Sequence, residues 1–188
     1  MDWITFSADV GLVAVGSATL SICLGLLMAV RYSPVRFWPH RRIDTFAIHR
    51  FLAYITIAAI ALHVAVLLFI HRVVFRVVDV LFPIHSPLQP VQNTLGAIAL
   101  YVLLLVLVTS LARVQIGRRL WKSLHYLVYP AGVLLFIHGV FTDSELKTGK
   151  ADLLDAEKVY VMICFLLVLA ASLGALCLRR IRARARIA

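Results

Sequence analysis

Four histidines stand inside two long apolar stretches of this 188-residue chain. His49 and His63 lie fourteen residues apart in the first stretch, and His125 and His138 lie thirteen residues apart in the second. An ionisable side chain within a membrane-spanning helix is costly, so each of these residues is a functional candidate by default. A single such histidine could equally be a packed polar residue bonded to a carbonyl, but four at two matched depths are harder to explain by packing.

The spacing places one histidine of each stretch near each membrane surface. At 1.5 Å per residue, the two histidines of a stretch lie about 20 Å apart along a helix. Fourteen residues return to within roughly 40° of the same face, whereas thirteen leave the rings roughly 140° apart on an ideal helix. Pro130 and Gly132 lie between His125 and His138. Proline permits a kink and a local change of winding, which would let both rings face the first stretch.

The chemistry that fits is ligation of b-type heme by two neutral imidazoles, inside an apolar slot that a helix bundle supplies. We expect two hemes, with His49, His63, His125 and His138 as axial ligands of the iron. Heme carboxylates need cations, or these cations instead reach the lipid headgroups. The candidates are Arg41, Arg42, Arg50 and Lys122 for the inner heme and Arg72, His71 and Arg76 for the outer one.

Other metal chemistry is less compatible with the sequence. No two histidines of one helix could share a zinc or copper ion at these spacings, and the spans contain no acid to complete a shell. Cys23, Cys164 and Cys177 form no CxxC or CxxCH motif, which argues against disulfides, iron–sulfur sites and covalent heme. His40 is expected to be a solvated loop histidine. His85 is expected to be a surface histidine near the headgroups, with a part in substrate access or in contact with a cofactor carboxylate as the alternative.

The composition indicates an integral membrane protein. Hydrophobic residues make up 62% of the chain, and the mean hydropathy is +0.95. Five runs have the roughly 20 residues that cross a bilayer core. We therefore predict an all-α membrane bundle of five helices, forming one heme-binding domain over residues 1–188, with spans at about 10–31, 47–70, 94–112, 120–141 and 159–178.

The net charge of +10 is read as an orientation signal. Most of the basic residues fall in the segments 31–50, 113–122 and 179–186, which the positive-inside rule places in the cytoplasm. The N-terminus is then outside and the C-terminus inside, and the second and fourth spans run parallel, which puts His49 level with His125. The basic excess would contact lipid headgroups, and no nucleic acid is expected.

The remaining segments are expected to be scaffold. The first span carries Gly11, Gly16 and Gly25, suits close helix packing and holds no candidate ligand. The third span is expected to form a wall. Residues 71–82 are expected to form an amphipathic interfacial helix, and Asp44 or Thr45 to cap the second span.

The segments GRRLWKSLHYLVYPAGVLLFIHG and HRFLAYITIAAIALH resemble the ferric-reductase-like transmembrane superfamily. It includes NADPH oxidases, ferric reductases and the heme-binding subunit of the periplasmic methionine-sulfoxide reductase, and the resemblance covers residues from about 45 to 178. It implies that His49 pairs with His125 and His63 with His138. Unlike the oxidases, the chain ends about ten residues after the last span without a dehydrogenase domain, and it lacks their usual extra helix before the first span. Flavin or NAD(P)H would act only through a separate partner.

The sequence thus predicts a di-heme cytochrome b in a bacterial inner membrane, the electron-transfer subunit of a transmembrane oxidoreductase. Electrons would pass from a cytoplasmic flavoprotein to a periplasmic acceptor such as a ferric chelate, oxygen or a redox protein. One alternative is the methionine-sulfoxide reductase subunit, although that subunit typically lacks a histidine at the position of His49. A quinone-binding anchor subunit is another. A histidine-based metal or proton transporter is disfavoured, since inverted repeats and intramembrane carboxylates are missing.

Overall fold

The computed structural model describes residues 3–30, 44–69, 75–142 and 155–185. These residues form helices and connecting turns with no strand, which confirms the predicted all-α class. The helices are α1 (Trp3–Ala29), α2 (Thr45–Leu67), α3 (Val77–Leu81), the 3-10 turn η2 (Pro83–His85), α4 (Pro90–Leu111), α5 (Arg113–Ile116), α6 (Arg118–His125), α7 (Val128–Phe141) and α8 (Ala156–Arg184).

Five helical stretches within the described residues are long and apolar enough to cross a membrane, with α6 and α7 together forming the fourth. The predicted number of spans is confirmed, but several boundaries differ from expectation. Helix α1 begins at Trp3 instead of near residue 10, and α8 continues to Arg184, six residues beyond the predicted end. A helix can extend past the apolar core of a bilayer without any change in its backbone hydrogen bonding, so hydropathy marks the core and not the helix end.

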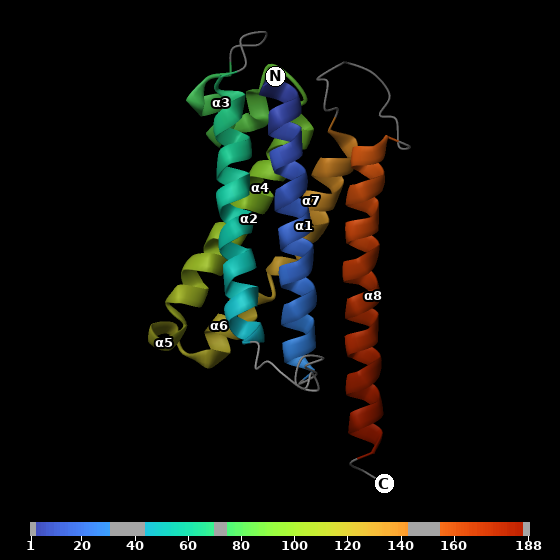
Figure 1. Cartoon of the computed structure of the whole chain (residues 1–188). Coiled ribbons are helices and arrows are strands. Elements are labelled where there is room, and N and C mark those ends of the chain that lie inside the picture. The colour runs from blue at the N-terminus through green and yellow to red at the C-terminus, as the bar shows by residue number, and fades with distance from the viewer. Residues whose placement is uncertain (1–2, 31–43, 70–74, 143–154, 186–188) are drawn as a thin grey trace.

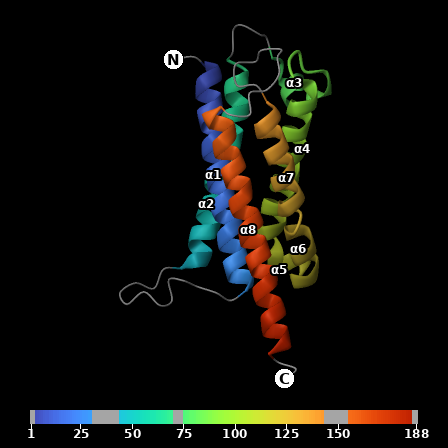
Figure 2. The same cartoon turned by 90° about the vertical axis from the view of Figure 1, so that its right-hand side faces the viewer.

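The helices form a bundle in which α1 runs antiparallel to α2 and parallel to α8 (Figure 1). Helix α1 packs against α2 and α8, and α4 packs against α7, while α2 also touches α4. Figure 2 shows α8 running along α1 and past α7. Helix α1 begins at one end of the bundle and α8 ends at the other (Figure 1). Helices α2 and α7 run in the same direction, as predicted for the second and fourth spans (Figure 1).

Helix α2 begins where its sequence supplies a cap. The carboxylate of Asp44 accepts hydrogen bonds from the backbone N–H groups of Phe46 and Ala47, at 3.0 and 3.1 Å. These two donors would otherwise have no partner inside the helix. The expected cap is confirmed, and it fixes the start of the helix four residues before His49.

The fourth span is broken between α6 and α7, one turn before Pro130. Proline has no N–H to offer the carbonyl of Tyr126, four residues earlier. Tyr126 and Leu127 instead form a turn, in which the N–H of Leu127 bonds to the carbonyl of Leu124 at 3.0 Å, only three residues back. The break therefore lies between His125 and His138, where the thirteen-residue spacing calls for a change of winding, and its place follows from Pro130.

The expected interfacial helix over residues 71–82 is shorter than predicted. In the described part of this segment only Val77–Leu81 is α-helical, and residues 70–74 lie outside the described residues. Phe82 has φ −130° and ψ 73°, and Pro83 then begins the 3-10 turn η2. Helix α3 and η2 both pack against α4.

Helices α1 and α2 approach closely because small and hydroxyl side chains line their contact. Ala14 and Ala59 are buried there, and the hydroxyls of Ser17 and Thr56 bond to each other at 2.9 Å. Thr56 lies seven residues from both His49 and His63, so this bond joins the two helices at mid-depth. Inside a bilayer such packing and interhelical bonds replace the hydrophobic effect that drives soluble proteins together.

We predict that Thr56→Val lowers the free energy of unfolding by about 0.6 kcal/mol, the average for interhelical hydrogen bonds in membranes. Valine keeps the branched shape and removes only the hydroxyl. Thr109→Val is the matched control, because the Thr109 hydroxyl bonds to the Leu105 and Val106 carbonyls of its own helix. Unfolding in detergent is the measurement, and equal losses for both variants would contradict the prediction.

Candidate functional site

The four intramembrane histidines form two facing pairs across the bundle. The ring centres of His49 and His125 lie 6.2 Å apart, and those of His63 and His138 lie 6.4 Å apart. The ring planes are inclined at 63° in the first pair and 78° in the second. Each pair joins α2 to the broken fourth span, and His49 lies four residues after the start of α2 whereas His63 lies four residues before its end. All four side chains are half-buried.

The separation of the rings suits one metal atom between them. An imidazole nitrogen binds a metal at about 2.0–2.1 Å, and its ring centre lies about 1 Å further away. Two imidazoles on opposite sides of one metal therefore have ring centres about 6 Å apart.

Three of the histidines have their tautomer fixed by a backbone carbonyl. The Nδ1 atom lies 2.8 Å from the carbonyl of Ser21 in His49, 2.7 Å from that of Ser7 in His63 and 2.8 Å from that of Gln92 in His138. A carbonyl can only accept, so Nδ1 carries the proton in each ring. The Nε2 lone pair is then available to a metal, and the bond through Nδ1 orients the ring.

His125 reaches the same tautomer through a hydroxyl. Its Nδ1 lies 3.2 Å from Oγ of Ser110, and that hydroxyl donates its single proton to the carbonyl of Val106 at 2.6 Å. The indole N–H of Trp121 also donates to Ser110 Oγ, at 3.3 Å. Since Ser110 has no proton left for His125, the Nδ1–H must be the donor. All four histidines therefore leave Nε2 unprotonated.

A glycine one helical turn after each carbonyl acceptor makes room for the ring. Ser7 is followed four residues later by Gly11, Ser21 by Gly25, and Gln92 by Gly96. A Cβ on these glycines would stand 3.3 Å from His63, 3.4 Å from His49 and 3.0 Å from His138, respectively. Residues four apart lie above one another on a helix, so the bare backbone lets each imidazole reach the carbonyl one turn away.

These hydrogen-bond partners escaped the sequence analysis, although a signal was present. Ser7 and Gly11 recur as Ser21 and Gly25 after fourteen residues, which is the spacing of His49 and His63 on the antiparallel neighbour. The hydroxyls of Ser7 and Ser21 also donate to the backbone carbonyls of His63 and His49. The third span is more than the predicted wall, because α4 supplies Gln92 and Ser110.

A cavity of about 210 Å³ surrounds the His63 and His138 rings. Its walls come from α1, α2, α4, α7 and α8, and α3 and η2 also line it. The lining is largely apolar, with Asp79, Asn93 and Glu157 among its polar members. Arg76 pairs with Asp79 at 3.1 Å, and this hydrogen bond from the guanidinium lowers the pKa of Asp79 below its usual value.

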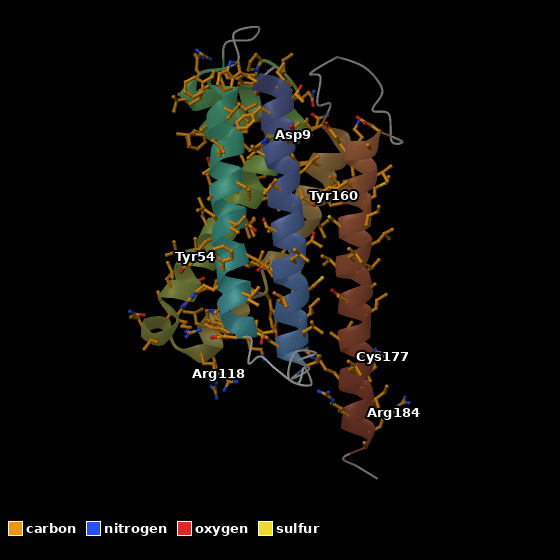
Figure 3. All side chains as sticks on the ribbon, in the orientation of Figure 1. Asp9, Tyr54, Arg118, Tyr160, Cys177 and Arg184 are labelled. Carbon is orange, nitrogen blue, oxygen red and sulfur yellow. The ribbon has the colours of Figure 1, made fainter. Side chains whose placement is uncertain are left out.

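Only some of the predicted cationic residues lie in the part of the chain that the structure describes. Arg50 lies over the ring of Phe46 at 5.9 Å, and Arg113, which the sequence analysis did not select, lies over the same ring at 5.1 Å. Lys122 lies 5.8 Å from the ring centre of Tyr126. His71, Arg72, His40, Arg41 and Arg42 lie outside the described residues. Arg118 and Arg184 stand at the same end of the bundle, with Asp9 near the other (Figure 3).

In the part of the chain that the structure describes, no three or more His, Cys, Asp or Glu side chains gather as a metal cluster. His85 is exposed in η2. Among the described residues, the candidates for holding a metal are therefore the two histidine pairs, each with two Nε2 atoms that carry no proton.

The sequence model of one protein family, described as the ferric reductase-like transmembrane component, matches residues 11–136 of the chain. The chain belongs to this family. The match includes His49, His63 and His125 and ends two residues before His138. Transmembrane domains of this family generally bind heme, and the paired imidazoles fit such a group. No curated protein and no solved structure matches the chain.

We predict that Gly96→Val lowers the heme content of the purified protein. The added side chain starts at a Cβ only 3.0 Å from the His138 ring and would push this imidazole away from the Gln92 carbonyl. Gly174→Val is the matched control, since no atom lies within 4 Å of the corresponding Cβ in α8. Pyridine hemochrome assay per chain is the measurement, and undiminished heme in Gly96→Val would contradict the steric argument.

Proposed function

We propose that the chain is a membrane cytochrome that holds two b-type hemes and moves electrons across the bilayer. His49 and His125 would ligate the inner heme, and His63 and His138 the outer one. The observation that carries the proposal is the pairing of the histidine rings, whose centres lie 6.2 and 6.4 Å apart. In all four rings Nδ1 donates a hydrogen bond, which leaves the lone pair of Nε2 available to bind iron. Family membership supports transmembrane electron transfer in general.

The protein's part is to ligate, bury and align the two groups. Bound heme would supply a one-electron couple between ferric and ferrous iron. The fourteen residues from His49 to His63 separate the two sites by about 21 Å along α2. Because a porphyrin extends well beyond its iron, the facing edges of the two groups would be closer than the metal sites.

The charge distribution supports the direction of transfer. Basic side chains at the end holding His49 and His125 include Arg50, Arg113 and Lys122, together with Arg118 of α6 (Figure 3). By the positive-inside rule this end would face the cytoplasm, and the membrane we propose is a bacterial inner membrane. A cytoplasmic flavoprotein would deliver electrons there, and an acceptor such as a ferric chelate, oxygen or a redox protein would take them from the His63 and His138 end.

The second candidate function is that of the heme-binding membrane subunit of a periplasmic methionine-sulfoxide reductase system, with one heme. It shares the family and would need only the His63 and His138 site. The pair of His49 and His125 favours the two-heme protein, since its rings are as close as those of the other pair and both are held through Nδ1.

We predict two hemes per chain in the purified protein and a reduced-minus-oxidised absorption spectrum of b type. His63→Ala should retain about one heme, and so should His49→Ala, because each leaves the opposite pair intact. His85→Ala is the matched control and should retain both, since this histidine is exposed in η2. Colourless protein after expression with heme supplied would contradict the electron-transfer function and favour a transporter, and a single heme lost only with His63→Ala would favour the sulfoxide-reductase subunit.

We predict that the C-terminus lies in the cytoplasm. Alkaline phosphatase fused to the C-terminus should then be inactive, whereas the same reporter fused after Thr142, at the opposite end of the bundle, should be active. The physical reason is the run of arginines at the end of α8, which resists translocation. The reverse pattern of activity would overturn the assigned orientation and with it the proposed direction of electron flow.

A further inference from the structure

One of the four histidines is held differently from the other three. His49, His63 and His138 donate through Nδ1 to a backbone carbonyl at 2.7 to 2.8 Å. His125 donates to the hydroxyl of Ser110 at 3.2 Å. The two members of the inner pair therefore face acceptors of different strength, whereas both members of the outer pair face carbonyls.

The difference between the acceptors of His125 and His138 arises at one position of α4. An acceptor carbonyl followed four residues later by a glycine occurs near the start of this helix, and the equivalent pair of positions fourteen residues later carries a serine in place of the glycine. Gln92 supplies the carbonyl for His138, and Gly96 leaves space one turn later. Fourteen residues further along, Val106 occupies the position of Gln92 and Ser110 that of Gly96. The Ser110 side chain thus stands where the outer site has no side chain, and its hydroxyl takes the Val106 carbonyl at 2.6 Å. The carbonyl that would match the other three sites is already bonded.

The Ser110 oxygen is also shared between two donors. Besides the His125 ring it accepts the indole N–H of Trp121 at 3.3 Å, and the Trp121 ring lies 5.2 Å from the His125 ring, centre to centre. A shorter bond from Nδ1 to a strong acceptor raises the basicity of the ligating Nε2, which favours ferric iron. A longer bond to a shared hydroxyl does so less, and hydrogen bonding around the ligand is one of the means by which a protein sets a heme potential.

We propose that Ser110 is a positioning residue which holds the reduction potential of the His49 and His125 heme above the value that a direct carbonyl bond would give. The inference rests on the proposed function. It adds that the two hemes differ in reduction potential and that the Ser110 side chain causes part of this difference. Trp121 contributes by keeping the Ser110 oxygen shared.

The test is a potentiometric titration of the purified heme protein, followed by absorption. Ser110→Gly recreates the glycine of the other three positions and frees the Val106 carbonyl for His125. One of the two hemes should shift to lower potential while the other stays unchanged. The same shift should appear in the His63→Ala background, where the remaining heme is the inner one, which assigns the effect to His125.

Two further variants make the result decisive. Trp121→Phe keeps an aromatic ring against His125 but removes the competing N–H, so the same heme should shift in the same direction by a smaller amount. Thr109→Gly is the matched control, because it puts a glycine in the same turn of α4 and removes a hydroxyl that also lies 3.2 Å from the Val106 carbonyl oxygen. It should leave both potentials unchanged.

The outcomes separate this inference from the function on which it rests. Two bound hemes whose potentials are unchanged or raised in Ser110→Gly and Trp121→Phe would overturn the role of Ser110 and leave the cytochrome intact. If Ser110→Gly does not fold, Trp121→Phe alone decides between these results. Protein that binds no heme would refute the proposed function and this inference together.

Discussion

A hydrogen bond from each histidine Nδ1 to a fixed oxygen on a neighbouring helix is the interaction on which the rest of the arrangement depends. It satisfies a polar atom that would be costly in a bilayer, and it leaves Nε2 without a proton. It also requires the helices to come close, which explains the glycines beside His63, His49 and His138. The scaffold helices α1 and α4 are thus part of the site, since they supply the acceptors.

The regularity of the bundle follows from the same requirement. Two sites about 20 Å apart must be served by straight helices, and a spacing of fourteen residues nearly restores the helix face. The spacing occurs in α2 as His49 and His63 and in α1 as Ser7 and Ser21. On α4 the acceptors are Gln92 and Ser110, because the Ser110 side chain replaces the carbonyl of Val106. The fourth span, with thirteen residues, is the exception and has the break before Pro130.

The sequence predicted the five spans, the parallel course of the second and fourth and the Asp44 cap, because hydropathy, charge and capping depend on side chains. The pairing of His49 with His125 and of His63 with His138 was implied by the family resemblance, since the thirteen-residue spacing alone left two of the rings on different faces. The sequence could not predict the carbonyl acceptors, because every residue has a backbone carbonyl and its side chain does not show which one accepts the bond. The only sequence signal is the glycine one helical turn after each acceptor. Arg113 was missed since its place beside Phe46 depends on the turn at α5. The start of α1 and the end of α8 were predicted too close to the apolar core, because helical hydrogen bonding continues beyond that core.

The central claim is that each histidine pair holds one iron between two imidazoles. Electron paramagnetic resonance of the oxidised, purified protein tests it most directly, because two imidazole ligands give a six-coordinate, low-spin ferric iron, whereas one leaves an open position and high-spin iron. The account predicts low-spin ferric signals that integrate to two per chain. High-spin iron as the main species, or one low-spin iron per chain with full heme loading, would contradict it.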